Sequence, residues 1–327
     1  MALLGEFELI ARYFTRPVRR AALGVGDDCA LLTTAPGMSL AISSDMLIEG
    51  RHFVSTVAPE RLGHKALAVN LSDLAACGAR PLAFSLSLAL PAADEAFLAP
   101  FARGLLALAE RHGCELIGGD TTRGPLAIAI TAFGEVATGA ALLRSGACAG
   151  DDLYVSGTLG DARLALEVLR GTAAAAGDGF ARIRRSMEEP TPRVALGQAL
   201  VGIASSAIDV SDGLVGDLGH VLRRSGVGAL VEVDALPRSA DLAAQAEALQ
   251  RECLLAGGDD YELVFTAASD RREAVVAAAR LADTPVTRIG RIEAGSRLRF
   301  VDAAGHEMSC PATSFDHFLP ASPASAP

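Results

Sequence analysis

An α/β protein with α+β layers, divided into two domains, is predicted by three features of the sequence. Strand-like and helix-like segments alternate along the chain. The 327 residues exceed the usual size of a single domain. Turn signals at both ends of 137–152 separate two halves. We therefore expect an N-terminal domain at 1–138, a linker at 139–150 and a C-terminal domain at 151–318.

The regular structure of the N-terminal half is expected to begin with a strand at 38–46, which ends in Ser43-Ser44-Asp45. An apolar helix at 60–79 follows and is closed by Gly78. The other elements expected in this half are a strand at 80–90 stopped by Pro91, a helix at 94–113 with Gly113 as C-cap, a strand at 114–122 that turns at Gly118-Gly119 before Asp120, and a strand at 125–136.

The C-terminal half is expected to open with a strand at 152–157 and a helix that runs through Leu169. A low-complexity loop at 171–180 interrupts the pattern. The remaining elements are a helix after Pro192, a strand, acidic turn and helix within 207–226, a strand at 228–236, a Gly-Gly turn and strand within 254–267, a helix from Asp270, strands at 286–292 and 297–302, and a disordered tail at 319–327.

Charge and hydropathy argue against several classes of protein. The net charge of −10 and the pI of about 5.1 disfavour non-specific binding of nucleic acid. No apolar run is long enough for a transmembrane helix. The N-terminus carries Glu6 and Glu8 and lacks the pattern of a signal peptide. We expect a cytoplasmic protein without nucleic-acid or membrane partners.

The cysteines and the single lysine limit the kinds of metal site and phosphate-handling mechanism that the chain could use. Six scattered cysteines form no CxxC pair, which argues against a structural zinc site. We expect them to be reduced thiols packed as small apolar residues. Lys65 is the only lysine, so it is the single candidate for a phosphate-handling mechanism that needs one.

Aspartates recur beside Gly or Ser at the ends of the expected elements. Each could merely cap a helix or begin a turn. However, Asp45 and Asp73 lie in apolar sequence, where an unpaired carboxylate is costly to bury. Asn70 and Asp73 are spaced to share one helical face. The full set is Asp27, Asp28, Asp45, Asp73, Asp120, Asp209, Asp212, Asp259 and Asp260.

Oxygen ligands without His or Cys clusters suit hard cations such as Mg²⁺. Several Mg²⁺ ions could hold a polyphosphate, and they would reverse the sign of an acidic pocket. The sequence has neither a GxxxxGK[ST] loop nor the HRD and DFG motifs of protein kinases. A nucleotide enzyme with this sequence would use a less common fold.

Six motifs, in order, resemble those of the thiamine-monophosphate kinases: GVGDDCALL, SSDMLIEGRHF, NLSDLAACGARP, GGDTTRG, DVSDGLVGDLGH and GGDDYELVF. The ending SFDHF is also similar, so the resemblance covers about residues 5–318. The wider superfamily includes aminoimidazole ribonucleotide synthetase, selenophosphate synthetase and a hydrogenase-maturation dehydratase. EGRHF and GGDDYEL favour the thiamine branch.

The resemblance implies a two-domain aminoimidazole ribonucleotide synthetase-like fold, whose N-terminal sheets form a barrel across a homodimer. It implies that phosphate passes from MgATP to thiamine monophosphate, the last step of thiamine diphosphate biosynthesis. The implied Mg²⁺ ligands are Asp27, Ser43, Ser44, Asp45, Asp73, Asp120, Asp209 and Asp212. The implied contacts to ATP are Gly119, Asp120, Arg144 and Ser211, and those to the substrate are His52, Asp260, Glu262, Phe315 and Phe318.

Direct in-line transfer fits these residues, because the accepting phosphate oxygen is already ionised and needs no general base. No residue is expected to act by covalent or acid–base catalysis, since no Ser-His or Cys-His pair is evident. One alternative is another ATP-dependent member of the superfamily, similar to aminoimidazole ribonucleotide synthetase. A second is a non-enzymatic module that binds Ca²⁺, Mg²⁺ or a nucleotide.

Overall fold

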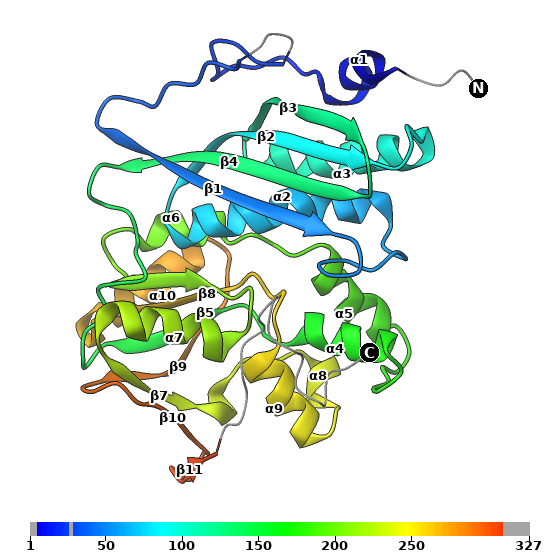
Figure 1. Ribbon diagram of the computed structural model, residues 1–327. Coiled ribbons are helices and arrows are strands. Elements are labelled where there is room, and N and C mark those ends of the chain that lie inside the picture. The colour runs from blue at the N-terminus through cyan, green and yellow to red at the C-terminus, as the bar shows by residue number, and fades with distance from the viewer. Residues whose placement is uncertain (1–4, 26–28, 310–327) are drawn as a thin grey trace. The chain divides into compact units, whose positions relative to one another are not determined.

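The structure is a computed structural model that describes residues 5–25 and 29–309 (Figure 1). Its contacts divide the chain into two compact units. The first unit comprises 1–74 and 79–141, and the second comprises 75–78 and 142–327. The tail expected at 319–327 lies outside the described residues. Within the described part of the chain, no helix is long and apolar enough to cross a membrane.

A four-stranded mixed sheet in the order β1-β4-β2-β3 forms the first unit. β4 pairs antiparallel with both β1 and β2, whereas β2 and β3 are parallel. Two helices lie on one face of this sheet (Figure 1). The elements are α1 (Glu6–Leu9), a π-helix (Ile10–Phe14), β1 (Met38–Ile48), α2 (Pro59–Ala76), β2 (Arg80–Leu90), α3 (Glu95–Arg111), β3 (Glu115–Arg123) and β4 (Ala127–Ala137).

The expected strands and helices of this half are confirmed, and so are both glycine C-caps. Gly78 and Gly113 have φ of 67° and 58°, the left-handed backbone that ends a helix. The turn predicted at Gly118-Gly119 is wrong. β3 continues through both glycines, and its register against β2 shifts between Leu116 and Gly118. Ile117 therefore forms a β-bulge, which glycine-rich sequence can accommodate as readily as a turn.

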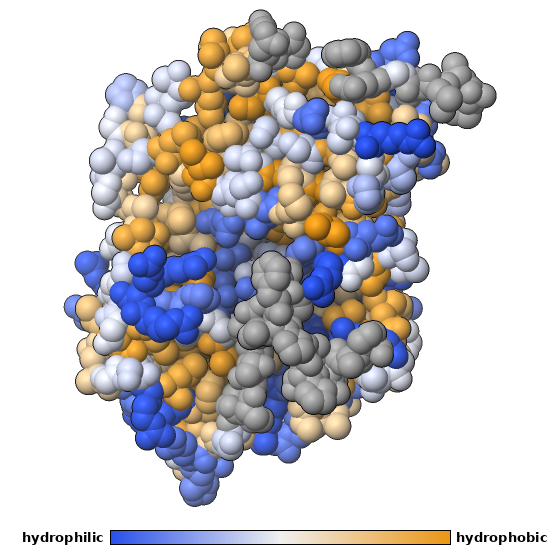
Figure 2. Space-filling view, viewed as in Figure 1, coloured by the Kyte–Doolittle hydropathy of each residue, from blue (hydrophilic) through white to orange (hydrophobic). Residues whose placement is uncertain are grey.

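One surface along β1 is apolar although it is exposed. Leu40, Ile42, Met46 and Ile48 are 45%, 61%, 55% and 41% exposed, and they alternate with less exposed residues. Figure 2 shows apolar side chains over the part of the first unit where Figure 1 places this strand. We call these four residues the β1 face. β1 is also an edge strand, so both its side chains and its backbone edge are available.

The second unit contains a seven-stranded mixed sheet in the order β11-β10-β7-β9-β5-β8-β6. The strands are β5 (Asp152–Ser156), β6 (Ser206–Asp209), β7 (Gly228–Glu232), β8 (Leu263–Ala267), β9 (Val286–Glu293), β10 (Leu298–Val301) and β11 (Glu307–Met308). The helices are α4 (Asp161–Leu169), α5 (Gly179–Glu188), α6 (Val194–Leu200), α7 (Leu214–Ser225), α8 (Ala240–Ala243), α9 (Glu247–Ala256) and α10 (Arg272–Leu281), with short 3₁₀ turns at Val233–Ala235 and Ser269–Arg271.

A buried cluster between strands and helices forms the core of the second unit, with Leu153, Leu164, Leu218 and Leu254 among its members. The strands and helices expected from the sequence are confirmed here. Sequence patterns did not predict α5, α8 or α9. The segment 254–267 was expected to hold a Gly-Gly turn and a strand, but its first three residues form the last turn of α9.

The five described cysteines are all free. Cys114 and Cys253 are buried, as expected, and burial raises the pKa of each thiol to about 12. The expectation of packed thiols is wrong for Cys29 and Cys148, which are exposed.

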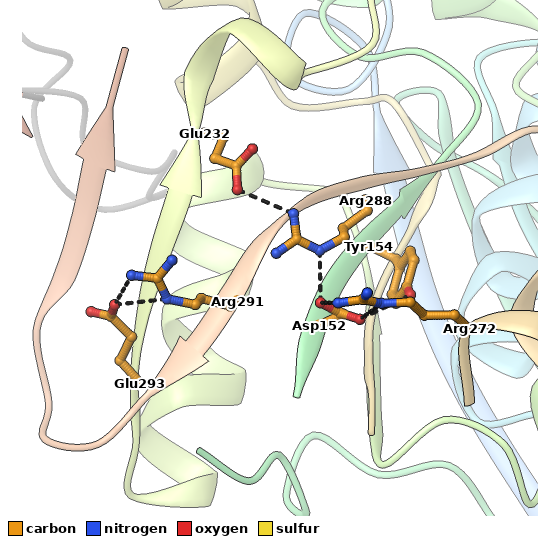
Figure 3. Close-up of polar contacts among 7 residues, drawn as sticks. All are labelled: Asp152, Tyr154, Glu232, Arg272, Arg288, Arg291 and Glu293. Atoms are coloured by element: carbon orange, nitrogen blue, oxygen red, sulfur yellow. Dashed lines mark hydrogen bonds and ion pairs between the residues drawn. The ribbon is translucent and has the colours of Figure 1, made fainter. Parts of the chain in front are cut away.

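A buried carboxylate, Asp152, anchors one region of the larger sheet (Figure 3). It is 3% exposed. Arg272 donates to it through Nε at 2.6 Å and Nη2 at 3.0 Å, and Arg288 donates through Nε at 2.6 Å. The bond from Arg272 is the largest cause that lowers the pKa of Asp152, which lies at about 2.

We expect Asp152 to make stability depend on pH. Its pKa is about 2 in the folded protein and about 3.9 unfolded, so its stabilisation is complete above about pH 5 and is lost as the pH falls toward 2. The difference corresponds to about 2 kcal/mol. Chemical denaturation should show Asp152→Asn about 2 kcal/mol less stable than wild type at pH 7, with the gap closing near pH 2.

The control for this experiment is Asp178→Asn, because Asp178 is exposed and its side chain makes no helix-capping hydrogen bond. Its stability should follow that of the wild type across the same pH range. A gap for Asp152→Asn that stays constant with pH would contradict the assignment.

Candidate functional site

Three sequence-predicted residues meet where β1 passes α2 in the first unit. The Ser43 hydroxyl donates a hydrogen bond to Oδ2 of Asp73. The carboxyl group of Asp73 also lies near enough to that of Asp45 to act on its pKa. Ser43 and Asp45 are two residues apart on a strand, so both side chains face the helix that carries Asp73. We call Ser43, Asp45 and Asp73 the carboxylate pair site.

Asn70 fixes the backbone of this site and was not assigned a role from sequence. It is fully buried; its Oδ1 accepts a hydrogen bond from the Asp45 amide at 3.2 Å, and its Nδ2 donates to the Ala66 carbonyl at 3.2 Å. The i, i+3 spacing of Asn70 and Asp73 predicted a shared helical face, and the contacts of both with β1 confirm it.

The charged form of Asp45 is disfavoured at this site. Burial, followed by the neighbouring charge of Asp73, raises the pKa of Asp45 from its ordinary value of 3.8 to about 7. Two acids held in contact in a half-buried position are costly unless a proton or a cation lies between them. This arrangement therefore favours a ligand with positive charge.

Ser44 and Asp120 lie elsewhere on the same sheet. The register places Asp45 in one row with Leu86 and Gly119, and Asp120 in the next row with Ser87. Asp120 is thus three strands from β1, roughly 14 Å across the sheet. Ser44 contacts Thr131, with 3.0 Å between the hydroxyl oxygens. By strand alternation, Ser44 and Asp120 belong to the face opposite Asp45.

Gly119 is required by the close approach of β3 to β2. Its φ is 145°, and a Cβ on it would lie 1.8 Å from the Leu86 carbonyl oxygen. Gly118 has open space around the corresponding position. These two neighbours therefore form a matched pair for testing the constraint.

Gly119→Ala is expected to destabilise the first unit by about 2–3 kcal/mol, because backbone atoms must move to admit the methyl group. Gly118→Ala should stay within about 1 kcal/mol of wild type. Urea denaturation measures both, and equal losses for the two variants would contradict the close approach as the cause.

His52 lies in the turn after β1, and Lys65 holds that turn. The ring nitrogen Nδ1 of His52 accepts a hydrogen bond from the Ile48 amide at 3.0 Å. Nζ of Lys65 donates to the His52 carbonyl at 3.1 Å, and Lys65 is only 1% exposed. The single lysine is thus buried beneath the turn, where it contacts backbone.

In the second unit, two acidic motifs are joined by backbone hydrogen bonds. Val210 donates to the Glu262 carbonyl at 2.8 Å, Tyr261 donates to the Val210 carbonyl at 2.8 Å, and Asp259 donates to the Ser211 carbonyl at 2.8 Å. Asp259 and Tyr261 have φ of 71° and 52°, a left-handed backbone that is strained for such residues. We call 209–213 the β6–α7 turn and 257–262 the acidic strap.

The β6–α7 turn presents three of the sequence-predicted residues. Asp209 ends β6 and is 4% exposed, while Ser211 and Asp212 follow before α7 begins. Asp217, in the first turn of α7, accepts hydrogen bonds on Oδ2 from the Ser211 and Asp212 amides, both at 3.0 Å. Burial raises the pKa of Asp217 to about 7.

The acidic strap places Asp260 and Glu262 in different surroundings. Oδ1 of Asp260 accepts from the Gly160 amide at 2.9 Å, whereas Oδ2 is buried without a partner among the described residues. Burial raises the pKa of Asp260 well above 3.8. Glu262 is saturated: Arg193 donates to it through Nε at 2.7 Å and Nη2 at 2.5 Å, and Ser156 donates at 2.5 Å.

Arg144 is exposed, and its charge acts on the nearby imidazole of His220 in α7. Burial is the main cause that lowers the pKa of His220; Arg223 and Arg144 lower it further, while Asp212 raises it. Arg144 and Asp212 therefore influence the same imidazole.

Three predicted residues, Asp27, Phe315 and Phe318, lie outside the described residues. Within 5–25 and 29–309, no three Asp, Glu, His or Cys side chains come together as a group that could hold a metal ion. Sequence reasoning also gave no role to Asn70, Asp217 or Arg193. The helical spacing of Asn70 offered a signal, but nothing in the sequence pointed to the partner of Arg193.

Comparisons with known proteins agree over nearly the whole chain. Residues 26–136 match the family described as AIR synthase related protein, N-terminal domain, and residues 149–303 match the corresponding C-terminal domain. Thiamine-monophosphate kinase of Salmonella typhimurium is 46% identical over 322 residues, which cover 96% of this chain and 98% of that protein.

Two solved structures are similar to this one. Thiamine-monophosphate kinase from Stenotrophomonas maltophilia K279a has a TM-score of 0.82 and 46% identity, covering 90% of this chain and 94% of its own. A structure named AaThiL complexed with AMPPCP and TMP has a TM-score of 0.76 and 30% identity, covering 88% and 89%. The chain therefore belongs to the thiamine-monophosphate kinases, within the family of AIR synthase related proteins.

Proposed function

We propose that this chain transfers a phosphoryl group from ATP to thiamine monophosphate, giving thiamine diphosphate and ADP. The names of its relatives support this reaction, and one related structure is named for a complex with AMPPCP and TMP. The observation in this chain that carries the proposal is the carboxylate pair site, where Ser43 bonds to Asp73 and the carboxyl group of Asp45 lies near that of Asp73.

The carboxylate pair site fits Mg²⁺. Its donors are oxygens, two from carboxylates and one from the Ser43 hydroxyl, and Mg²⁺ commonly takes one or two carboxylates while water and phosphate complete its shell. Bound Mg²⁺ would offset the charge of the phosphates. We keep Asp27, Ser44, Asp120, Asp209 and Asp212 as proposed ligands of further ions, since Ser44 and Asp120 belong to the face of the sheet opposite Asp45.

The chain's residues need only bind and orient two phosphates. A terminal oxygen of thiamine monophosphate attacks the γ-phosphorus of ATP, and the bond from that phosphorus to the β–γ bridging oxygen breaks as ADP leaves. The attacking oxygen is already ionised, so no side chain has to remove a proton. Gly119, Asp120, Arg144 and Ser211 are proposed to contact ATP, and His52 the substrate phosphate.

The unpartnered Oδ2 of Asp260 supports a contact with the thiamine part of the substrate. A buried acceptor without a donor is costly, and a donor group of the ligand would satisfy it. Phe315 and Phe318 complete the proposed substrate contacts. Because Glu262 is already bound by Arg193 and Ser156, we assign it the role of holding the acidic strap beside Asp260.

We further propose that the chain forms a homodimer through the β1 face, where the N-terminal sheets of two copies close into a barrel. An exposed apolar edge strand supports this, since pairing would cover both its side chains and its free backbone edge. We also propose a cytoplasmic location, which the five free cysteines of the described chain support.

Ile42→Asp is expected to convert the dimer into a monomer, because it places a charge in the middle of the β1 face, where Ile42 is 61% exposed. Sedimentation velocity or light scattering after gel filtration measures the mass. Leu281→Asp is the control, since Leu281 is 83% exposed on α10 of the second unit and does not belong to the β1 face. A dimer that survives Ile42→Asp would contradict the proposed interface.

The reaction is tested with purified protein, ATP, Mg²⁺ and thiamine monophosphate, with thiamine diphosphate and ADP quantified together. We expect equal amounts of the two products. The absence of thiamine diphosphate, together with ring closure on formylglycinamidine ribonucleotide, would support an aminoimidazole ribonucleotide synthetase-like activity instead. Binding of nucleotide without turnover of either acceptor would support a binding module.

A further inference from the structure

The side chain of Asp217 accepts hydrogen bonds from backbone amides of the turn that precedes α7. α7 begins after Gly213, which has no side chain to cap the helix. The amides of Ser211 and Asp212 precede the helix, and both donate to the same oxygen of Asp217. Asp217 is itself anchored, because its amide donates to the Gly213 carbonyl at 3.0 Å and its side chain is buried.

The opposite side of the β6–α7 turn is held by the acidic strap. Ser211 thus has its amide on Asp217 and its carbonyl on the Asp259 amide. The strap approaches so closely that a Cβ on Gly258 would lie 2.4 Å from the Ser211 carbonyl oxygen. The amide and the carbonyl of Ser211 are thus both hydrogen-bonded. These bonds fix the backbone conformation of the turn, and therefore the directions in which the neighbouring side chains leave it.

A buried carboxylate costs free energy at this place that a neutral capping side chain would not. Asp217 is 4% exposed, and it lies near enough to Asp212 for the two charges to repel. Ser, Thr or Asn would satisfy an amide without that repulsion. The carboxylate oxygen has one advantage over a neutral acceptor, since its bonds to the two amides are charge-assisted.

We propose that Asp217 is a positioning residue, which orients Asp209, Ser211 and Asp212 for the metal ion and ATP by holding the amides of the β6–α7 turn. The inference rests on the proposed function of those three residues. We assign Asp217 no direct contact with the metal ion, because its Oδ2 already accepts two backbone amides. Side chains that orient metal ligands commonly contribute 10- to 100-fold to affinity or activity.

The test compares Asp217→Asn with Asp217→Leu in the full-length protein. Asn retains one oxygen that can accept both amides, whereas Leu has a similar volume and no acceptor. Hydrogen–deuterium exchange, read on peptides covering 207–214, should be about tenfold faster in Asp217→Leu and nearly unchanged in Asp217→Asn. If the Leu variant does not fold, Asp217→Ser takes its place, since a serine hydroxyl is too short to reach both amides.

Two further readouts separate positioning from general stability. Binding of Mn²⁺, followed by its electron paramagnetic resonance signal without nucleotide, should weaken about tenfold in Asp217→Leu. The kcat should fall about 10- to 100-fold while KM for thiamine monophosphate changes little. Glu167→Leu is the control: Glu167 is buried and bonded to Arg163 and Thr172, and its loss should leave all three readouts at wild-type values.

Unchanged exchange and unchanged Mn²⁺ affinity in Asp217→Leu would overturn the proposal. So would a loss of Mn²⁺ affinity in Asp217→Asn as large as in Asp217→Leu, because Asp217 would then be a ligand. Exchange and Mn²⁺ binding need no thiamine substrate, so a failed kinase assay with the expected exchange pattern would count against the proposed reaction and not against the positioning role.

Discussion

Asp45→Asn is expected to lower kcat by about 10³-fold while the protein stays folded. Asp45 contributes one of the two carboxylates of the carboxylate pair site, and the neutral amide would bind a hard cation weakly. The substitution also removes the repulsion with Asp73, so the free energy of unfolding without metal should equal or exceed that of the wild type. The measurement pairs steady-state kinetics with urea denaturation.

The matched control for Asp45→Asn is Asp94→Asn in the same unit. Asp94 is the N-cap of α3, its side chain accepts from the Ala96 amide, and Asn caps helices equally well. Activity and stability of the control should therefore match the wild type. If the Asp45→Asn variant kept the wild-type kcat, the assignment of this site to metal binding would be contradicted.

The second substitution with a large expected effect changes the free energy of unfolding. Glu262→Ala is expected to cost about 3–5 kcal/mol, because it leaves the guanidinium of Arg193, 19% exposed, without its buried partner. Glu262→Gln keeps the shape and should cost less. The double variant Arg193→Met with Glu262→Met should recover much of the loss, since it removes both charges and retains volume.

A second ion pair of the same unit provides the comparison for Glu262. Arg291 and Glu293 form a more exposed pair, at 50% and 22%, and Glu293 also accepts from Arg299, which is 29% exposed. Because all three side chains are more exposed than Glu262, at 7%, Glu293→Ala should change stability by at most about 1 kcal/mol (Figure 3). Denaturation curves of all four proteins give the ranking. If Glu262→Ala cost no more than Glu293→Ala, Glu262 could not be the support of the acidic strap.

The parts of the fold that follow from local sequence were predictable. Alternation marked β1, helical spacing placed Asn70 and Asp73 on one face, and glycines marked the C-caps of α2 and α3. At the candidate site, the same rules suggested that Asp209 and Asp212 flank a strand-to-helix turn, as observed. Each of these predictions concerns residues within a few positions of one another.

Long-range pairings were beyond those rules. The contact of Asp45 with Asp73 depends on how β1 packs against α2, and the joining of the β6–α7 turn to the acidic strap spans about fifty residues of sequence. Arg193 reaches Glu262 across 69 positions. The Gly118-Gly119 error has a similar origin, because only pairing with β2 shows that the chain continues as a strand.

The burial of Lys65 removes the only side-chain amine of the chain from the reach of amine-reactive reagents. This side chain is the only lysine in the sequence, and it is 1% exposed. An acylating reagent can reach its Nζ only when the structure around the His52 turn opens. The rate of modification at this one position therefore reports the opening of the first unit directly, without any engineered label, and ligands that hold that unit closed should slow it.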